Sequence, residues 1–220
     1  MERLEDLNLL GLKIFQDDTL YKFTSDSVVL SKFARVKNGD VVADFCSGSG
    51  IVGIHLYGLN PVIKSVTLFE MQKTLYDLSV KSIEINNLSD KFCAVNTKIQ
   101  DIDPIYNEKF SLIVCNPPYS KLDCGEHDEN PEIDVCKREV CLSLKELVLA
   151  FKKALKFGGR VCMVHRADRL AEVIFELKNN ALEPKRVQFV SGKNKKPYLV
   201  LIEAVKGGKE GIEVLNTLIN

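Results

Sequence analysis

The sequence predicts an α/β fold with a doubly wound, mostly parallel sheet of seven strands that ends in an antiparallel hairpin. From Asp40 onward, short apolar runs typical of buried strands alternate with helical patterns, and this alternation produces parallel strands joined by right-handed crossovers. A glycine-rich turn at residues 47–50 follows the first strand pattern, as expected where a strand turns tightly into a helix. Only residues 191–197 join the last two strand patterns, which is too short for a crossover, so these strands are predicted to be antiparallel.

The strand patterns of the predicted main domain, residues 39–220, cover 41–46, 65–70, 92–97, 110–115, 160–165, 187–190 and 198–205. Helical patterns lie between them at 51–59, about 75–85 and 169–179. A further helix opens at Ser143 with an S-x-x-E capping box and is predicted to end at Gly158-Gly159. The stretch 120–138 is polar and has no period, and loops of that length are usually functional or disordered.

Residues 1–38 are predicted to form a small N-terminal extension that acts as a lid. The runs 12–15 and 20–23 alternate between apolar and polar residues and can pair as a hairpin. A Thr-Ser-Asp sequence at 24–26 can then cap a helix that ends near Asn38-Gly39. The first ten residues show no clear pattern.

Composition predicts a cytoplasmic globular protein. The chain has 220 residues, 45% hydrophobic and 27% charged, with a net charge of zero. No apolar stretch approaches the roughly 18 residues of a membrane span, and the N-terminus is charged, so neither a membrane anchor nor a signal peptide is expected. Seven cysteines, several of them in apolar strand patterns, suit a reducing compartment. No metal site is predicted, because the candidate set lacks a C-x-x-C pair; its members are Cys124, His127, Cys136 and Cys141.

Charge is unevenly distributed along the chain. Residues 151–209 hold 14 lysines and arginines against 5 acidic residues, and such a basic segment can face phosphates or can simply be a solvated surface. The candidates for phosphate contacts are Arg138, Lys193, Lys195 and Lys196.

The stretch Asn116-Pro117-Pro118-Tyr119 directly follows the strand pattern at 110–115. Prolines make the backbone rigid there, and ligands of open α/β sheets bind at the carboxyl ends of the strands. Asn116 and the Pro117 carbonyl can accept hydrogen bonds from a planar group that carries an NH2, and Tyr119 can stack on its face. The alternative is an ordinary loop start, since Asn-Pro marks turns in many proteins.

Two cofactors compete for the turn after the first strand. Residues 48–53 match G-x-G-x-x-G and Glu70 lies about twenty residues further on, which would suit a dinucleotide and an oxidoreductase. Against this, the Asp44 carboxylate would repel a pyrophosphate but would attract an ammonium group. S-adenosylmethionine carries an ammonium and no phosphate, and Glu70 can accept hydrogen bonds from its ribose hydroxyls.

The segment 44–50 resembles the D-x-G-x-G-x-G motif of class I S-adenosylmethionine-dependent methyltransferases, whose fold is Rossmann-like. Glu70 matches their acidic second motif, and residues 116–119 match the N-P-P-Y of amino-group methyltransferases. The chain as a whole resembles the bacterial tRNA1(Val) (adenine-37-N6)-methyltransferase family over nearly all of residues 8–215. The flanking segments that carry this likeness are Phe23–Leu30 (F-x-x-D-x-x-L-L), Cys136–Glu139 (A-R-x-E) and Val164–Leu170 (V-H-R-x-x-R-L).

This resemblance implies methyl transfer from S-adenosylmethionine to N6 of an adenosine in tRNA, at position 37 beside the anticodon, by a monomeric enzyme. The implied catalytic residues are Asn116, Pro117 and Tyr119. The implied cofactor-binding residues are Asp26, Asp44, Cys46, Ser47, Gly48, Gly50, Glu70, Met71, Asp101 and Asn116.

The sequence departs from the family at two cofactor positions. Cys46 replaces the first glycine of the motif, which is expected to require only a small residue. Lys98 stands where the family has an Asp that holds the adenine amino group, and Asp101 follows three residues later. Either backbone amides and apolar neighbours hold the adenine, or Asp101 substitutes.

Three other functions fit parts of the pattern. N-P-P-Y also occurs in DNA adenine methyltransferases, which generally need a recognition domain, and in protein-glutamine methyltransferases, which commonly carry an N-terminal helical domain; neither is expected in 220 residues. A non-catalytic RNA-binding module with a vestigial cofactor site is the alternative from outside the enzymes.

Overall fold

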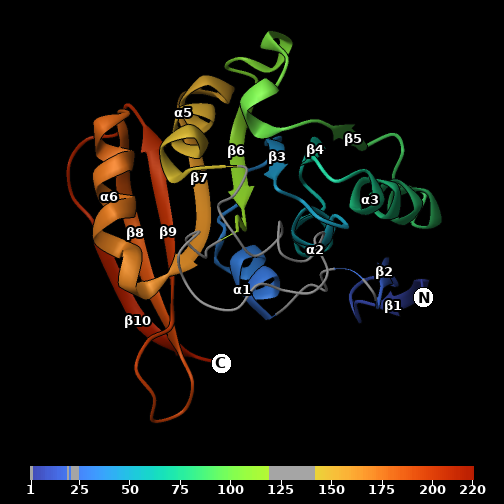
Figure 1. Cartoon of the computed structure of the whole chain (residues 1–220), viewed down its shortest axis with the longest axis horizontal. Helices are drawn as coiled ribbons and strands as arrows, with labels where there is room; N and C mark the ends of the chain where they lie inside the picture. The colour runs from blue at the N-terminus through green and yellow to red at the C-terminus, as the bar shows by residue number, and fades with distance from the viewer. Residues whose placement is uncertain (1, 19, 21–24, 119–141) are drawn as a thin grey trace.

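The main sheet of the protein has eight strands in the order β10-β8-β9-β7-β6-β3-β4-β5, one more than predicted (Figure 1). The computed structural model describes residues 2–18, 20, 25–118 and 142–220. The strand order reverses between β3 and β6, and this switch point is where open α/β sheets bind ligands.

Five neighbouring strands, from β7 to the edge strand β5, form the parallel part of the sheet: β3 (Val41–Phe45), β4 (Ser65–Glu70), β5 (Phe92–Asn96), β6 (Phe110–Cys115) and β7 (Leu155–Arg166). Each neighbouring pair among them is parallel. Strands β4 and β6 have the predicted bounds, and β6 is buried at every position, as its unbroken apolar run indicates.

The antiparallel hairpin is confirmed by β8 (Leu182–Ser191) and β9 (Leu199–Lys206), and β9 also pairs antiparallel with β7. The eighth strand, β10 (Glu213–Ile219), lies parallel to β8 at the edge of the sheet. It was not predicted, because its side chains are mostly exposed and show no apolar alternation.

Helices cover both faces of the sheet. On one face lie α1 (Ser25–Phe33), α2 (Ile51–Leu59) and α3 (Lys73–Ile85), which share a core cluster with the strands. On the other face, α5 (Leu144–Ala154) and α6 (Leu170–Asn179) pack on a second cluster. The period of two along the strands therefore sends alternate side chains into two separate cores.

The start of α5 is as predicted, and its end is not. Ser143 Oγ accepts a hydrogen bond from the Glu146 amide, and the Glu146 carboxylate accepts one from the Ser143 amide at 2.9 Å. The helix stops at Ala154, and Gly158-Gly159 lie within β7 rather than at a helix end. The register between β6 and β7 shifts beside these glycines, and Gly158 has a φ of +73°. The two glycines therefore allow an irregularity within the strand.

The N-terminal hairpin differs from the prediction. Strand β2 (Lys13–Asp17) pairs with β1 (Glu2–Asp6). Its predicted partner was 20–23, of which residues 21–23 lie outside the described residues. The hairpin is held on α3, where Ser82 Oγ accepts a hydrogen bond from the Phe15 amide at 2.9 Å. Helix α1 also ends earlier than predicted, at Phe33.

Candidate active site

The candidate residues gather at the carboxyl ends of β3, β4 and β6. In the register of these parallel strands, Phe45 is opposite both Phe69 and Cys115. The turn after β3 is therefore flanked by Glu70 on one side and Asn116 on the other. Helix α1 lies at this same edge, below the end of β6 (Figure 1).

The turn after β3 has a left-handed backbone at several positions. Cys46 has a φ of 58°, Gly48 of 55° and Gly50 of 91°. Gly50 is required by its conformation, and a Cβ there would also lie 2.9 Å from Leu68 Cδ1 and displace the end of that side chain. The prediction that position 46 needs only a small residue was incomplete, because this position also demands a positive φ, which a cysteine adopts at a cost of about 1–2 kcal/mol.

Asp44 lies beneath this turn and is fully buried. Its Oδ2 accepts a hydrogen bond from the Gly53 amide at 2.8 Å, whereas Oδ1 has no hydrogen-bond partner among the described residues. Burial, opposed by the Gly53 hydrogen bond and assisted by the charge of Glu70, raises the pKa of Asp44 to about 8. A buried carboxylate with one unpaired oxygen fits a cationic group such as the ammonium of S-adenosylmethionine, and it also ties β3 to α2.

Glu70 connects β4 to the same turn. Its Oε2 accepts a hydrogen bond from the Gly48 amide and its Oε1 from the Gln72 amide, both at 2.8 Å. Each carboxylate oxygen has a second lone pair, so both can still accept from ribose hydroxyls. Burial raises the pKa of Glu70. Beside it, Ser47 is buried and its Oγ has no partner among the described residues, which supplies a further polar atom for a ligand.

Asn116 follows β6 and is joined to helix α1. Its Nδ2 donates a hydrogen bond to Ser27 Oγ at 3.0 Å. Ser27 is buried and Asn116 is half-buried, while Pro117 is buried against the end of the strand. Sequence reasoning did not single out Ser27, although it lies within the F-x-x-D-x-x-L-L segment. Tyr119 lies outside the described residues.

Two further predicted cofactor residues lie close to these elements. Asp26 occupies the first turn of α1, immediately before Ser27, and its Oδ1 accepts a hydrogen bond from Ser25 Oγ at 3.4 Å. Met71 follows Glu70, and its carbonyl accepts a hydrogen bond from Asn96 Nδ2 at 3.0 Å. Asn96, at the end of β5, thereby holds the loop after β4.

Lys98 and Asp101, the residues at and near the family's adenine-binding position, both follow β5. Asp101 ends a 3₁₀ helix, η1 (Ile99–Asp101), and its amide donates to the Lys98 carbonyl at 3.0 Å. The side chains of Asp101 and Lys98 are both exposed and follow the carboxyl end of β5.

The predicted phosphate-binding lysines lie in the turn between β8 and β9, and Lys193, Lys195 and Lys196 are all exposed. Because β8 and β7 are both antiparallel to β9, β8 ends at the same edge of the sheet as β7. Figure 1 shows this turn extending below that edge. Arg138 lies outside the described residues.

Within the described residues, no group of three or more His, Cys, Asp or Glu side chains is arranged to hold a metal ion. The four residues considered for zinc, at 124, 127, 136 and 141, lie outside them. No helix in the described part of the chain is both long enough and apolar enough to cross a membrane.

The fold and the site define a class I methyltransferase, the class whose methyl donor is S-adenosylmethionine. The chain belongs to the methyltransferase small domain family, whose model matches residues 23–180. Among solved structures, a tRNA m1G37 methyltransferase from M. jannaschii superimposes with a TM-score of 0.65 at 14% identity, over 94% of this chain and 57% of that one. A TYW2 from the same organism, in complex with AdoMet, gives 0.63 at 13% identity, over 92% and 84%. At such identities these structures show the fold alone.

Curated proteins of two kinds are similar to this chain. A tRNA1(Val) (adenine(37)-N6)-methyltransferase from Flavobacterium johnsoniae is 23% identical over 178 residues, covering 80% of this chain and 74% of the relative. The corresponding protein from Parabacteroides distasonis is also 23% identical, over 81% and 73%. A release factor glutamine methyltransferase from Mycoplasma mycoides is 34% identical over 107 residues, which is 46% of this chain and 35% of that relative.

Proposed function

We propose that this protein transfers a methyl group from S-adenosylmethionine to N6 of an adenosine in tRNA, at position 37 beside the anticodon. The observation that carries the proposal is the placement of Asn116. Asn116 lies at the end of β6, next to the glycine turn that follows β3. Its side-chain amide is held by a hydrogen bond to Ser27. Because the NH2 group donates to Ser27, the oxygen Oδ1 is directed away from Ser27 and serves as an acceptor for a target amine.

S-adenosylmethionine supplies a methyl group activated by a sulfonium. In this proposal Asp44 and Asp26 hold its methionine end, the backbone of Gly48 and Gly50 contacts its body, and Glu70 accepts from its ribose. Residues 1–38 then act as a lid on the methyltransferase domain at 39–220.

The exocyclic amine of adenine is a poor nucleophile, because its lone pair is delocalised into the ring. Asn116 Oδ1 and the Pro117 carbonyl accept hydrogen bonds from the two amine protons, which localises the lone pair and aims it at the methyl carbon. Tyr119 stacks on the base, which leaves its own stack to enter the pocket. Methylation releases one amine proton, which passes to water, so no strong general base is needed.

Two observations favour tRNA as the substrate: the extent of the alignment with relatives named for tRNA, and the exposed lysines at the edge of the sheet where Asn116 lies. The relatives named for tRNA1(Val) align over about four fifths of this chain. Lys193, Lys195 and Lys196 are exposed at the same edge as Asn116, where they can contact phosphates.

A second candidate is methylation of a protein glutamine, which the 34% identity to a release factor glutamine methyltransferase favours. A glutamine side chain also ends in a planar group with an NH2, so the same grip by Asn116 would serve. The match covers only 46% of this chain, however. It therefore supports a common methyltransferase fold more than a common substrate. DNA adenine methylation and a non-catalytic RNA-binding role are the remaining alternatives.

The decisive experiment is methyl transfer from radiolabelled S-adenosylmethionine into total tRNA from a strain that lacks this protein, with parallel reactions on release factor and DNA. Label in N6-methyladenosine of tRNA would support the proposal. Label in the release factor or in DNA alone would keep the chemistry and overturn the substrate. A thermal shift with NAD but not with S-adenosylmethionine would overturn the cofactor as well.

A further inference from the structure

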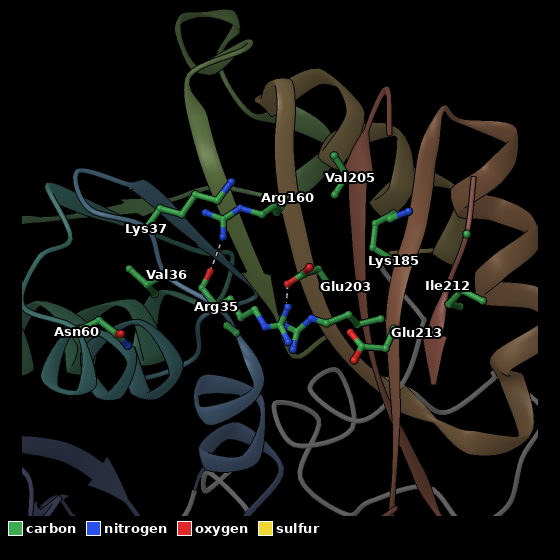
Figure 2. A pocket seen from close by; sticks show the side chains of 13 residues that line it. Arg35, Val36, Lys37, Asn60, Arg160, Lys185, Glu203, Val205, Ile212 and Glu213 are labelled. Atoms are coloured by element: carbon green, nitrogen blue, oxygen red, sulfur yellow. Dashed lines mark hydrogen bonds and ion pairs between the residues drawn. The ribbon is translucent and has the colours of Figure 1, made fainter. Parts of the chain in front are cut away.

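A hollow lies on the α1 side of the sheet, away from the edge that carries the candidate active site (Figure 2). It is a groove of about 970 Å³ between the end of α1 and the strands β7, β8 and β10. Arg160, in the middle of β7, is paired with Asp40 just before β3, and Asn60 lies just after α2, so the groove lies toward the amino ends of the parallel strands. The groove is lined by Ala34, Arg35, Val36, Lys37, Asn60, Arg160, Lys185, Arg186, Glu203, Val205, Gly211, Ile212 and Glu213.

The groove carries an excess of positive charge, because five basic side chains line it against the acidic Glu203 and Glu213, with Asp40 paired to Arg160. Two of its arginines are neutralised by buried carboxylates: Arg160 by Asp40 at 2.6 Å and Arg186 by Glu203 at 2.8 Å. Arg35 and Lys37 are exposed, and neither side chain has a hydrogen-bond or ion-pair partner among the described residues. Figure 2 shows both of them at the α1 side of the groove, where they can meet an anion.

An irregularity in β8 adds a further positive charge to the groove. Pro184 pairs with Ala204 and Arg186 pairs with Glu203, so Lys185 is an extra residue on its strand. Such a bulge redirects a side chain that strict alternation would send to the opposite face. Lys185 consequently lines the groove next to Arg186, where its ammonium donates to the Lys209 carbonyl at 3.0 Å.

Arg186 provides an independent sign of a missing acceptor. It is 5% exposed, and its Nη2 donates to the Phe33 carbonyl at 2.9 Å and to Glu203. Its Nε is buried and has no acceptor among the described residues. A buried guanidinium donor left unpaired is costly, and a water molecule that bridges Nε to an anion in the groove would satisfy it.

We propose that this groove binds phosphates of the tRNA backbone, a step that rests on the proposed tRNA substrate. Strand β8 connects the groove to the turn that carries Lys193, Lys195 and Lys196: from Lys185 to Ser191, where the strand ends, it spans about 20 Å. The anticodon loop would then occupy the edge near Asn116, while the stem runs along β8 so that its phosphates reach Arg35 and Lys37. Double-stranded RNA is recognised mostly through such contacts to phosphate and sugar.

The test compares the double variant Arg35→Ala/Lys37→Ala with the matched control Lys152→Ala/Lys153→Ala, which removes two exposed charges from α5 on the other face of the sheet. Binding of the tRNA substrate is measured at several salt concentrations. We expect the groove variant to bind about tenfold more weakly, with a salt slope lower by about 1.5, because two phosphate contacts are lost. The control should bind like the unaltered protein. An RNA hairpin with the anticodon loop on a three-base-pair stem is too short to reach the groove and should bind both variants equally.

Unchanged tRNA binding by the groove variant, or an equal loss in the control, would overturn the inference while leaving the proposed function intact. Protection against heat by inorganic phosphate, lost in the groove variant without any change in tRNA binding, would show a small-anion site and also overturn it. If the unaltered protein binds S-adenosylmethionine but neither binds nor methylates tRNA, the proposed substrate fails and the groove loses its proposed occupant with it.

Discussion

The Asn116 side chain donates a hydrogen bond to Ser27 Oγ at 3.0 Å, across 89 positions of sequence. This contact joins the end of the central strand β6 to the first turn of α1. Nδ2 of the Asn116 amide faces Ser27, and Oδ1 is therefore directed elsewhere as an acceptor. Helix α1 thus contributes to the site by positioning a group that another element supplies.

Ser27→Ala should lower kcat about tenfold, because Asn116 loses the contact that orients its amide; this corresponds to about 1.4 kcal/mol. Single-turnover methyl transfer into tRNA measures the effect, and affinity for S-adenosylmethionine should stay unchanged. Lys32→Ala, an exposed change in the last turn of the same helix, is the control. Equal rates for both variants would show that Ser27 does not position Asn116.

Asn116→Ala should abolish methyl transfer, by at least about 10²–10³-fold, because the amine loses an acceptor that acts in the transition state. Cofactor affinity should be largely retained. Asp44→Ala should show the opposite pattern, with the loss of cofactor binding as its first defect. Calorimetric titration with S-adenosylmethionine, alongside turnover, separates the two variants, and near-normal turnover of Asn116→Ala would exclude the proposed grip on the amine.

Asp44 should make the cofactor-free protein less stable as the pH rises. Its pKa is about 8 in the folded protein and 3.8 ordinarily, so between these values the folded state holds a proton that the unfolded state lacks. The free energy of unfolding therefore falls by up to about 1.4 kcal/mol per pH unit in this window. Asp44→Asn should flatten the dependence of the urea midpoint between pH 5 and 7.5. Glu70, whose pKa is also raised, leaves a residual slope in the variant. A slope identical to that of the unaltered protein would refute the assignment.

Asp101→Ala should weaken the binding of S-adenosylmethionine about tenfold if Asp101 replaces the usual adenine-binding carboxylate, as we expect. Lys98→Ala, at the position that aligns with the family's Asp, should have no such effect. S-adenosylhomocysteine titrated against both variants gives the comparison. Equal affinities would assign the adenine to backbone amides and apolar neighbours instead.

Buried strands were predicted correctly from the sequence, and an exposed strand was not. Strands β4 and β6 were placed with their observed bounds because nearly all of their side chains enter the core. Strand β10 was missed because an exposed edge strand carries almost no apolar pattern. The glycine pair at 158–159 was read as a helix end, since a local pattern cannot distinguish a C-cap from a bulge inside a strand.

Those parts of the candidate site that lie within one short stretch of sequence could be predicted. The glycine turn and the Asn-Pro-Pro stretch follow buried strands directly, so their meeting at one edge follows from the parallel topology. The contact of Asn116 with Ser27 and the pairing of β1 with β2 depend on how distant segments pack. No local periodicity encodes such contacts.

Asp40→Ala should destabilise the protein by about 3–5 kcal/mol, because it leaves the buried Arg160 guanidinium without its charge partner. The pair is 2.6 Å apart, with side chains 7% and 5% exposed, and Asp40 also accepts hydrogen bonds from Ser111 Oγ and the Lys37 amide. These contacts tie the start of β3 to β6 and β7 beneath the site. Urea unfolding measures the loss, with Asp77→Ala as control. Asp77 forms an exposed pair with Lys73, so its removal should cost under about 0.5 kcal/mol. A similar small cost for both variants would mean that the buried pair contributes no more than a surface one.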